Sequence, residues 1–358
     1  MKDGRVRVLV VDDSPLFAQL IAEMIEGDPE LEVIGIARDG KEAVEMVAAH
    51  RPDLVTMDIQ MPVMDGLMAI EQIMARHPTP ILVLTADPRG YSGELSMEAL
   101  RSGALDLVVK PASWPVSKAE QNDLAHRIKL LASVRVVRHV AGGRRDRARV
   151  AGLDPLRGAV PGRMIGLVAS TGGPAALATI LADLPRGLSA GIAVVQHMGT
   201  GFTNTLAAWL DRTTPLDVRV AVAGAPVEPG VVVIAPDGAH LTITRRGRVQ
   251  LERGRRVNGH CPSGTVLLES LAHSFGTSAL GVVLTGMGRD GADGLRIIRD
   301  RGGVALAQDE ETSAVYGMPK AAMESAAAQR ALPLPRVASA LRHFAERGET
   351  LPLRSGPQ

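Results

Sequence analysis

The first 111 residues alternate short apolar runs with stretches of helical periodicity, and this alternation constrains the fold more than any other feature. The runs are rich in Val, Leu and Ile and lie at 6–11, 33–37, 54–57, 81–85 and 107–109. Near-continuous apolar strands are typical of a parallel sheet that helices cover on both faces. The pattern predicts a (βα)5 domain, whose last helix begins at the capping-box sequence Ser117-Lys118-Ala119-Glu120.

A second alternation of the same kind occupies the other half of the chain. Its expected strands lie at 164–169, 192–196, 218–222, 231–234, 241–244, 249–251, 279–285 and 304–307, and the fifth and sixth would form a hairpin. Helical patterns separate most of the others, which predicts a second doubly wound, mostly parallel α/β domain. Two domains are also the number expected for 358 residues.

The segment between the two alternations has a different composition. It is rich in Gly, Pro and Arg and has neither a helical nor a strand period. Its arginines have no aromatic residues between them, which argues against a nucleic-acid contact. We therefore predict a first domain at 1–137, a linker at 138–161 and a second domain at 162–350.

Charge and cysteine content narrow the class of protein. Forty basic and 39 acidic side chains leave a net charge of +1, so the whole chain has no field that would attract nucleic acid. Cys261 is the single cysteine, which excludes a disulfide within the chain and suits a reducing compartment. The sequence has no run of 18 apolar residues, so we expect a cytoplasmic location without membrane insertion.

Five polar residues stand at the ends of strands in the first domain. Asp12 and Asp13 follow the first strand, Asp58 the third, Thr85 the fourth and Lys110 the fifth. The carboxyl ends of parallel strands share one edge, where open α/β sheets bind ligands. Three carboxylates there favour a hard cation such as Mg²⁺, and Asp58 can then act as a nucleophile toward a phosphoryl group. Thr85 and Lys110 would bind the phosphoryl oxygens.

The segments VVDDS, MDIQMPVMDG, VLTAD and VVKP, in this order, resemble the response-regulator receiver family, which has a flavodoxin-like fold. The resemblance implies that Asp58 accepts phosphate from a sensor histidine kinase, and that the Gln60 carbonyl helps Asp12 and Asp13 to hold Mg²⁺. Leu107 stands where receivers often carry an aromatic residue that reads out phosphorylation. We also expect a cis peptide bond in the turn at Lys110-Pro111.

Three residues at strand ends of the second domain have the chemistry of a serine hydrolase. Ser170 lies where a strand passes into a helix, His197 follows the next strand, and Asp290 lies in the loop after the strand at 279–285. Ser170 could attack a carbonyl, His197 could take its proton, and Asp290 could fix the tautomer of the histidine. The order Ser, His, Asp and the absence of G-x-S-x-G disfavour the α/β-hydrolase superfamily.

Other interpretations of the second domain remain open on the residues alone. The loop from Gly286 to Gly291 reads GMGRDG, and Asp309 follows the next strand, as in a dinucleotide-binding fingerprint. The domain could therefore bind a nucleotide or a partner without hydrolysis, in a phosphorelay protein. Cys261 beside His260 could form a thiol nucleophile, although adjacent residues rarely pair in this way. The second half of the chain has no pattern of a basic recognition helix, which argues against a DNA-binding regulator.

The segments VASTGGP, QHMGTGFT, VIAPDGAHL, HCPSG, VVLTGMGRDGADGL and AQDEETSAVYGMP resemble the catalytic domain of the CheB family of chemotaxis protein-glutamate methylesterases. The resemblance implies that Ser170 is the nucleophile, His197 the general base and acid, and Asp290 its orienting partner. It also implies that the Met287 N–H stabilises the oxyanion and that Thr171 supports the histidine.

The implied reaction is hydrolysis of glutamate γ-methyl esters on methyl-accepting chemoreceptors, which releases methanol, together with deamidation of receptor glutamine. The esterase would need no cofactor, and its unphosphorylated receiver would repress it. The expected partners are chemoreceptors and a chemotaxis histidine kinase, and neither nucleic acid nor the membrane is an expected partner. Thr265 departs from the family pattern, because many relatives have an aspartate at this position.

Overall fold

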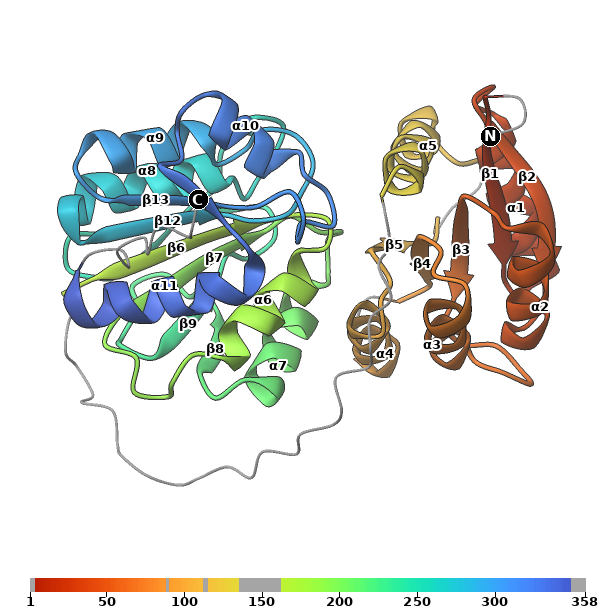
Figure 1. The fold of residues 1–358 in the computed structure, drawn as a ribbon, viewed down its shortest axis with the longest axis horizontal. Helices are drawn as coiled ribbons and strands as arrows, with labels where there is room; N and C mark the ends of the chain where they lie inside the picture. Colours follow the sequence, from red (N-terminus) through yellow and green to blue (C-terminus); the bar gives the residue numbers. More distant parts are fainter. Residues whose placement is uncertain (1–3, 88–89, 112–114, 135–161, 349–358) are drawn as a thin grey trace, which may run out of the picture. The chain divides into compact units, whose positions relative to one another are not determined.

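The computed structural model describes residues 4–87, 90–111, 115–134 and 162–348 (Figure 1). The chain divides into two compact units, Met1–Asp146 and Arg147–Gln358, and each is described by itself. The linker predicted at 138–161 lies outside the described residues. In the described part of the chain, no helix is both long and apolar enough to cross a bilayer.

The N-terminal unit is built on a five-stranded parallel sheet with the order β2-β1-β3-β4-β5 (Figure 1). Its strands are β1 Val6–Val11, β2 Leu31–Ala37, β3 Leu54–Asp58, β4 Ile81–Thr85 and β5 Asp106–Val109. Its helices are α1 Pro15–Glu26, α2 Gly40–His50, α3 Gly66–Arg76, α4 Gly90–Arg101 and α5 Lys118–Ala132. The predicted (βα)5 fold is confirmed.

Side-chain caps fix where the helices of this unit begin. Ser14, Asp39 and Asp65 accept hydrogen bonds from backbone N–H groups in the first turns of α1, α2 and α3. At α5, Ser117 Oγ accepts from Glu120 N at 3.2 Å, and the Glu120 carboxylate accepts from Ser117 N at 3.0 Å. The capping box predicted from the sequence is therefore present, and it satisfies two backbone donors at the start of the helix.

The C-terminal unit contains a seven-stranded parallel sheet with the order β14-β13-β12-β6-β7-β9-β8. Its strands are β6 Met164–Ala169, β7 Gly191–Gln196, β8 Asp217–Val220, β9 Val231–Ile234, β12 Ala279–Val283, β13 Val304–Gln308 and β14 Arg330–Leu332. The predicted hairpin is a separate antiparallel pair, β10 His240–Ile243 and β11 Val249–Glu252. The short strand β14 was not expected from the sequence.

Helices cover both faces of the larger sheet (Figure 1). One face carries α6 Gly173–Ala182, α7 Thr203–Thr213 and α11 Leu334–Arg347, and the other carries α8 Gly264–Phe275, α9 Ala292–Asp300 and α10 Met318–Glu324. The central strands are apolar and fully buried, as burial on both faces requires. The second unit is therefore the doubly wound α/β domain that the sequence predicts.

The order of the strands places the functional loops. The first strand of the domain, β6, pairs with β7 on one side and with β12 on the other. The chain thus leaves β6 in one direction and returns to its other side later. Ligands of open α/β sheets bind at such a switch point, beyond the carboxyl ends of the strands. The loops that follow β6, β7 and β12 meet there.

One local prediction is wrong. Among the described residues the cis peptide bond is Cys261–Pro262, and Lys110–Pro111 is not cis. The cis and trans forms of an X–Pro bond differ by only about 0.5–1 kcal/mol. The surrounding tertiary contacts therefore select the isomer, and the dipeptide sequence does not reveal it.

Candidate functional sites

Ser170 lies at a tight turn between β6 and α6. Its backbone N–H donates to Thr285 O at 3.0 Å, which ties the turn to the end of β12. Two glycines allow the backbone conformation and the close packing of this turn. Gly172 has a φ of +75°, and a Cβ at Gly173 would lie 2.0 Å from the side-chain oxygen of Gln196. The sequence STGGP therefore brings the serine to the beginning of a helix with small residues beside it.

His197 lies next to Ser170 because β6 and β7 pair in parallel. Ala169 is in register with Gln196, and His197 N donates to Ala169 O at 2.9 Å. The buried Gln196 amide then donates to Ser170 O at 2.7 Å and to His197 O at 2.8 Å. This amide fixes the backbone of the two neighbouring strand ends, and it holds the serine and the histidine in one place.

Asp290 is the third member of the cluster. Its Oδ2 lies 2.9 Å from His197 Nε2, and the carboxylate is 1% exposed. Four further donors surround it: Gly264 N at 2.6 Å, Ser263 Oγ at 2.7 Å, Thr265 N at 3.2 Å and Asn258 Nδ2 at 3.4 Å. Two of these are backbone groups in the first turn of α8, so Asp290 acts as the N-terminal cap of a helix remote in sequence.

This environment keeps Asp290 ionised. Burial by itself would raise its pKa, but the hydrogen bonds from His197, Ser263 and Gly264 outweigh burial and hold the pKa of this carboxyl well below its usual range. An ionised carboxylate can only accept, so His197 Nε2 carries the proton of this hydrogen bond. Nδ1 is then the basic nitrogen of the ring. It is buried and has no hydrogen-bond partner among the described residues.

A second histidine covers the face of the first. The rings of His197 and His260 are stacked with centroids 3.8 Å apart and an interplanar angle of 3°. His260 is positioned by a two-way backbone bridge with Val257, in which each N–H donates to the other carbonyl at 3.0 Å. The stack limits the rotation of the His197 ring to its own plane.

The glycine-rich loop after β12 approaches the serine closely. A Cβ at Gly286 would lie 2.6 Å from Ser170 Cβ, so only glycine permits this approach. Met287 follows in the same loop and is half-buried. The Thr285 hydroxyl donates to Thr171 O at 2.9 Å, which joins this loop to the Ser170 turn. The expected oxyanion and support residues, Met287 and Thr171, thus belong to the segments that meet at Ser170.

Two acids bear on the dinucleotide interpretation: Asp290, which would repel a pyrophosphate, and Asp309, which would bind the ribose. Asp290 within the loop is committed to His197 and α8. Asp309 accepts from Thr312 N at 3.0 Å and from Thr312 Oγ1 at 2.6 Å, which closes a turn after β13. Oδ1 of Asp309, the acid that a dinucleotide site would use at the ribose, is therefore occupied within the chain.

The second cluster lies in the N-terminal unit, at the carboxyl edge of its sheet. Lys110 Nζ lies 2.7 Å from Asp12 Oδ2 and 2.7 Å from Asp58 Oδ2. Oxygen atoms of Asp12, Asp58 and the exposed Asp13 all lie within 4.8 Å of one another. Three hard oxygen donors at this spacing fit a divalent cation. Thr85 is buried beside them, and its hydroxyl donates to Asp87 O at 3.2 Å.

Burial and the ion pairs shift the titration of this cluster. Burial raises the pKa of Asp12, although Lys110 opposes the shift. Burial would lower the pKa of Lys110, but hydrogen bonds with Asp12 and Asp58 outweigh it, and the pKa is raised. Lys110 is therefore a permanent cation at physiological pH. It balances part of the negative charge that the three acids concentrate.

The loop after β3 wraps closely around Asp58. Asp58 Oδ1 accepts from Ile59 N at 2.7 Å, and Gly66 N donates to Ile59 O at 2.9 Å. A Cβ at Gly66 would lie 2.1 Å from Asp58 O, so glycine is required where the loop returns to α3. Gln60 is exposed at the start of this loop, two positions after Asp58.

Comparison with known proteins identifies the family. The family model described as CheB methylesterase matches residues 165–341, and the response regulator receiver domain model matches residues 8–117. The protein-glutamate methylesterase/protein-glutamine glutaminase 2 of Anaeromyxobacter dehalogenans is 48% identical over 344 residues, which cover 96% of this chain and 98% of the relative. The chain belongs to the CheB methylesterase family. The resemblance seen in the sequence is thereby confirmed.

Two further CheB proteins support this family assignment. The protein-glutamate methylesterase/protein-glutamine glutaminase 4 of Myxococcus xanthus is 44% identical over 346 residues, covering 95% of this chain and 97% of the relative. The crystal structure of the Thermotoga maritima CheB methylesterase catalytic domain is 38% identical, with a TM-score of 0.50. It covers 52% of this chain and 100% of that domain. The two-domain α/β fold class predicted from the sequence is confirmed.

Sequence reasoning overlooked several residues of this CheB site. Ser263 precedes an apolar helical run and has the pattern of an N-cap, yet its hydroxyl donates to Asp290 instead of capping α8. Asn258 and His260 lie in a loop without periodicity, and no local signal indicates their contacts with Asp290 and His197. In the sequence, only the segment HCPSG, which resembles the CheB family, indicates that this region belongs to the site.

The two departures from family patterns have structural consequences. Thr265 Oγ1 accepts from Gly291 N at 2.9 Å and from Asn258 Nδ2 at 3.2 Å, so a neutral hydroxyl joins the Asp290 loop to α8. An aspartate at this position would add a second negative charge beside Asp290. Leu107 is buried in β5, and it offers no ring that could turn toward Lys110.

Proposed function

We propose that this chain is a phosphorylation-regulated enzyme that hydrolyses glutamate γ-methyl esters of chemoreceptors and deamidates receptor glutamine. The names of its relatives support the activity. The observation that carries the proposal is the buried His197–Asp290 pair, 2.9 Å apart, at the turn that holds Ser170. The alternative of a non-hydrolytic phosphorelay protein receives no support from the family or from the glycine-rich loop.

The first half of the proposed reaction forms an acyl-serine. Ser170 Oγ attacks the ester carbonyl carbon while His197 Nδ1 takes the hydroxyl proton. Asp290 stabilises the resulting imidazolium through its hydrogen bond with Nε2. The same proton then passes to the leaving oxygen as the C–O bond breaks, and methanol departs. With a glutamine substrate the leaving group is ammonia.

The second half releases the product. Water attacks the acyl carbon, His197 accepts its proton, and the Ser170 oxygen leaves with that proton to regenerate the free enzyme and a glutamate. The negative charge of each tetrahedral intermediate faces the Met287 N–H and the first turn of α6 in the proposed arrangement. Thr171 supports the histidine. None of these steps needs a cofactor.

The N-terminal domain is the proposed switch. Asp58 accepts the phosphoryl group from a chemotaxis histidine kinase, and Thr85 and Lys110 bind its oxygens. Asp12, Asp13 and Asp58, with the Gln60 carbonyl, would hold Mg²⁺, which neutralises charge on the incoming group. The proposal includes a cytoplasmic location, because a chain with one cysteine suits a reducing compartment.

The decisive test compares Ser170→Ala with the native chain on methyl-labelled chemoreceptor membranes. Ser170→Ala should lose at least about 10³-fold in methanol release, because removing the nucleophile of a triad costs several orders of magnitude. Phosphorylation of Asp58 by a small phosphodonor with Mg²⁺ should be unchanged, since it takes place in the other domain. Ser339→Ala, on α11, is the matched control.

Two results would contradict the assignment. More than about a tenth of the native rate in Ser170→Ala would remove this serine from the mechanism. No methanol release by the native chain, with or without the phosphodonor, would reject the activity itself.

A further inference from the structure

The segment from Arg245 to Arg256 concentrates positive charge. Its twelve residues include six arginines and one acid, Glu252, which gives the segment a net charge of +5, whereas the whole chain has +1. All six arginines are exposed. We call them the arginine strip, and its members are Arg245, Arg246, Arg248, Arg253, Arg255 and Arg256.

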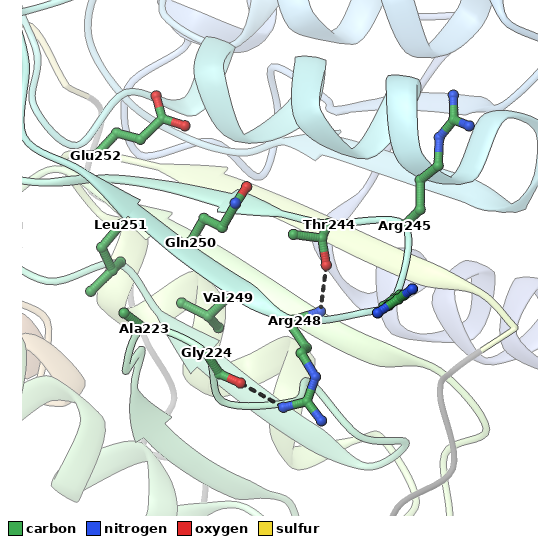
Figure 2. Close-up of a pocket in the computed structure, with 10 residues that line it drawn as sticks. Ala223, Gly224, Thr244, Arg245, Arg248, Val249, Gln250, Leu251 and Glu252 are labelled. Carbon is green, nitrogen blue, oxygen red and sulfur yellow. Dashed lines mark hydrogen bonds between the residues drawn. The ribbon is translucent and has the colours of Figure 1, made fainter.

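The charge of the arginine strip is not neutralised within the described part of the chain. None of its members forms an ion pair with a described acid, and their recorded side-chain contacts are with backbone oxygens. Arg248 donates to Gly224 O at 2.7 Å, along a shallow pocket beside the hairpin, and Arg245 points away from the strands (Figure 2). These guanidinium groups are therefore available to an external anion.

A rigid scaffold presents the strip. One face of the β10–β11 hairpin is buried through Leu241, Ile243 and Val249. Ile243 also exchanges two hydrogen bonds with α8, because its N–H donates to Ser270 Oγ at 3.1 Å and its carbonyl accepts from Ser274 Oγ at 2.8 Å. The arginines lie at the two ends of this hairpin: Arg245, Arg246 and Arg248 in its turn, and Arg253, Arg255 and Arg256 directly after β11.

One end of the strip borders the catalytic cluster. Arg255 O lies 3.0 Å from His240 Nε2, and His240 Nδ1 accepts from Ser263 N at 3.2 Å. Ser263 in turn donates to Asp290. The chain runs on from Arg256 through the Val257 bridge to His260, which stacks on His197. Arg253, Arg255 and Arg256 are therefore part of the rim of the proposed active site.

The other end of the strip lies at the hairpin turn. Strand β11 has four residues, so roughly 13 Å of extended chain separates its two ends, at about 3.3 Å per residue. A segment of this length matches several residues of a bound polypeptide. The arginines thus lie at both ends of β11, and the second group precedes the segment that reaches His197 through His260.

We propose that the arginine strip binds carboxylate side chains that flank the reacting ester or amide on the protein substrate. This inference rests on the proposed function and adds the class of substrate: an acidic segment rather than a neutral one. The guanidinium fork matches a carboxylate in shape and can bind it with two hydrogen bonds. The reaction itself acts on glutamate derivatives, so carboxylates are the side chains that its product presents.

Two synthetic peptides test the proposal with the full-length protein. Both carry a central glutamate γ-methyl ester, flanked by four glutamates in one and by four glutamines in the other. The measured quantity is the ratio of kcat/KM for the acidic peptide to kcat/KM for the neutral one, from methanol release. We expect a ratio of about 10 at low ionic strength and a ratio near 1 in about 0.5 M salt, because exposed charge pairs are screened.

Substitutions test whether the preference for the acidic peptide depends on the arginine strip. The variant Arg253→Gln/Arg255→Gln/Arg256→Gln should lower the ratio below about 2, whereas Arg253→Lys/Arg255→Lys/Arg256→Lys should keep most of it, because it keeps the charge. The matched control is Arg336→Gln/Arg342→Gln/Arg347→Gln, which removes three exposed arginines of α11 that also form no ion pair with a described residue. Taking a ratio cancels any general loss of folded or active enzyme.

The outcomes separate this inference from the proposed function. Methanol release from both peptides with a ratio near 1, or a ratio that the glutamine variant leaves unchanged, would overturn the arginine strip while leaving the esterase intact. No methanol from either peptide or from methylated receptor membranes would overturn both. A ratio near 1 together with strip-dependent binding of a labelled RNA would identify a nucleic-acid surface instead.

Discussion

Replacing Asp290 by asparagine tests how the catalytic cluster is built. The Asp290 carboxylate accepts five hydrogen bonds, two at Oδ2 and three at Oδ1. An amide has one accepting oxygen, and its NH₂ group can only donate. In one orientation the NH₂ faces Gly264 N, and in the other it faces Thr265 N. At least one buried backbone donor of α8 therefore loses its partner in Asp290→Asn.

The hydrogen bonds lost in Asp290→Asn set the expected loss of stability. An unsatisfied buried donor costs about 1–3 kcal/mol, and hydrogen bonds to a charged acceptor contribute about 1.5–3 kcal/mol each. We expect a net loss of about 3 kcal/mol, which lowers the Tm of a domain of this size by roughly 6–12 °C. The rate should fall about 10⁴-fold, because the amide selects the His197 tautomer that cannot take the Ser170 proton.

Thermal unfolding and methanol release together provide the assay. Asp293→Asn is the control, because Asp293 is three positions away, partly exposed and paired with Arg296 on the surface of α9. It should change stability by less than about 1 kcal/mol. A Tm loss below about 2 °C in Asp290→Asn would refute the five-donor account. A rate loss below about 100-fold would refute the orienting role.

The stability difference between the native chain and Asp290→Asn should depend on pH in a defined direction. The folded chain holds the pKa of Asp290 below its unfolded value of about 3.9, so the carboxylate contributes stability above that pH and loses it as the pH falls through the folded pKa. The stability gap between the native chain and Asp290→Asn should shrink as the pH falls below about 4.

Two further outcomes test regulation and positioning. A fragment beginning at Pro161 should exceed the unphosphorylated full-length enzyme by roughly 5- to 150-fold, as coupling energies of about 1–3 kcal/mol imply, and Asp58→Asn should match the unphosphorylated enzyme. Initial ester-hydrolysis rates decide this, and equal rates in fragment, full-length and phosphorylated protein would reject repression by the receiver. His260→Ala should lower kcat about 10-fold or more by freeing the His197 ring, whereas His260→Phe should restore most of it, because misplaced catalytic groups cost up to about 10²-fold. An unchanged kcat in His260→Ala would show that the stack has no positioning role.

Periodicity and strand ends were enough to predict where the polar clusters form. Parallel strands deliver their C-terminal residues to one edge, so the sequence alone groups Asp12, Asp58 and Lys110. The structure brings Lys110 Nζ within 2.7 Å of both acids. The same reasoning grouped His197 with Asp290, which lie 2.9 Å apart. In both domains parallel pairing brings the strand ends together, and the strands themselves can be recognised from local sequence.

Contacts made by side chains from irregular segments could not be predicted in this way. Asn258, His260 and Ser263 reach the catalytic cluster from a loop that has no period, and their contacts are with Asp290 and His197, which are distant in sequence. Periodicity reports which face of an element is buried, but it carries no information on which residues of distant elements meet there.

The amino-acid sequence by itself determined the two α/β domains, the order of their strands along the chain, and the sheet edges where the chemistry lies. The tertiary structure alone decided which nitrogen of His197 bonds to Asp290, which helix end neutralises that acid, and which proline bond is cis. The physical reason is the range of the interactions. Strand and helix patterns arise from neighbours in sequence, whereas buried hydrogen bonds pair whatever donors and acceptors the packed core brings together.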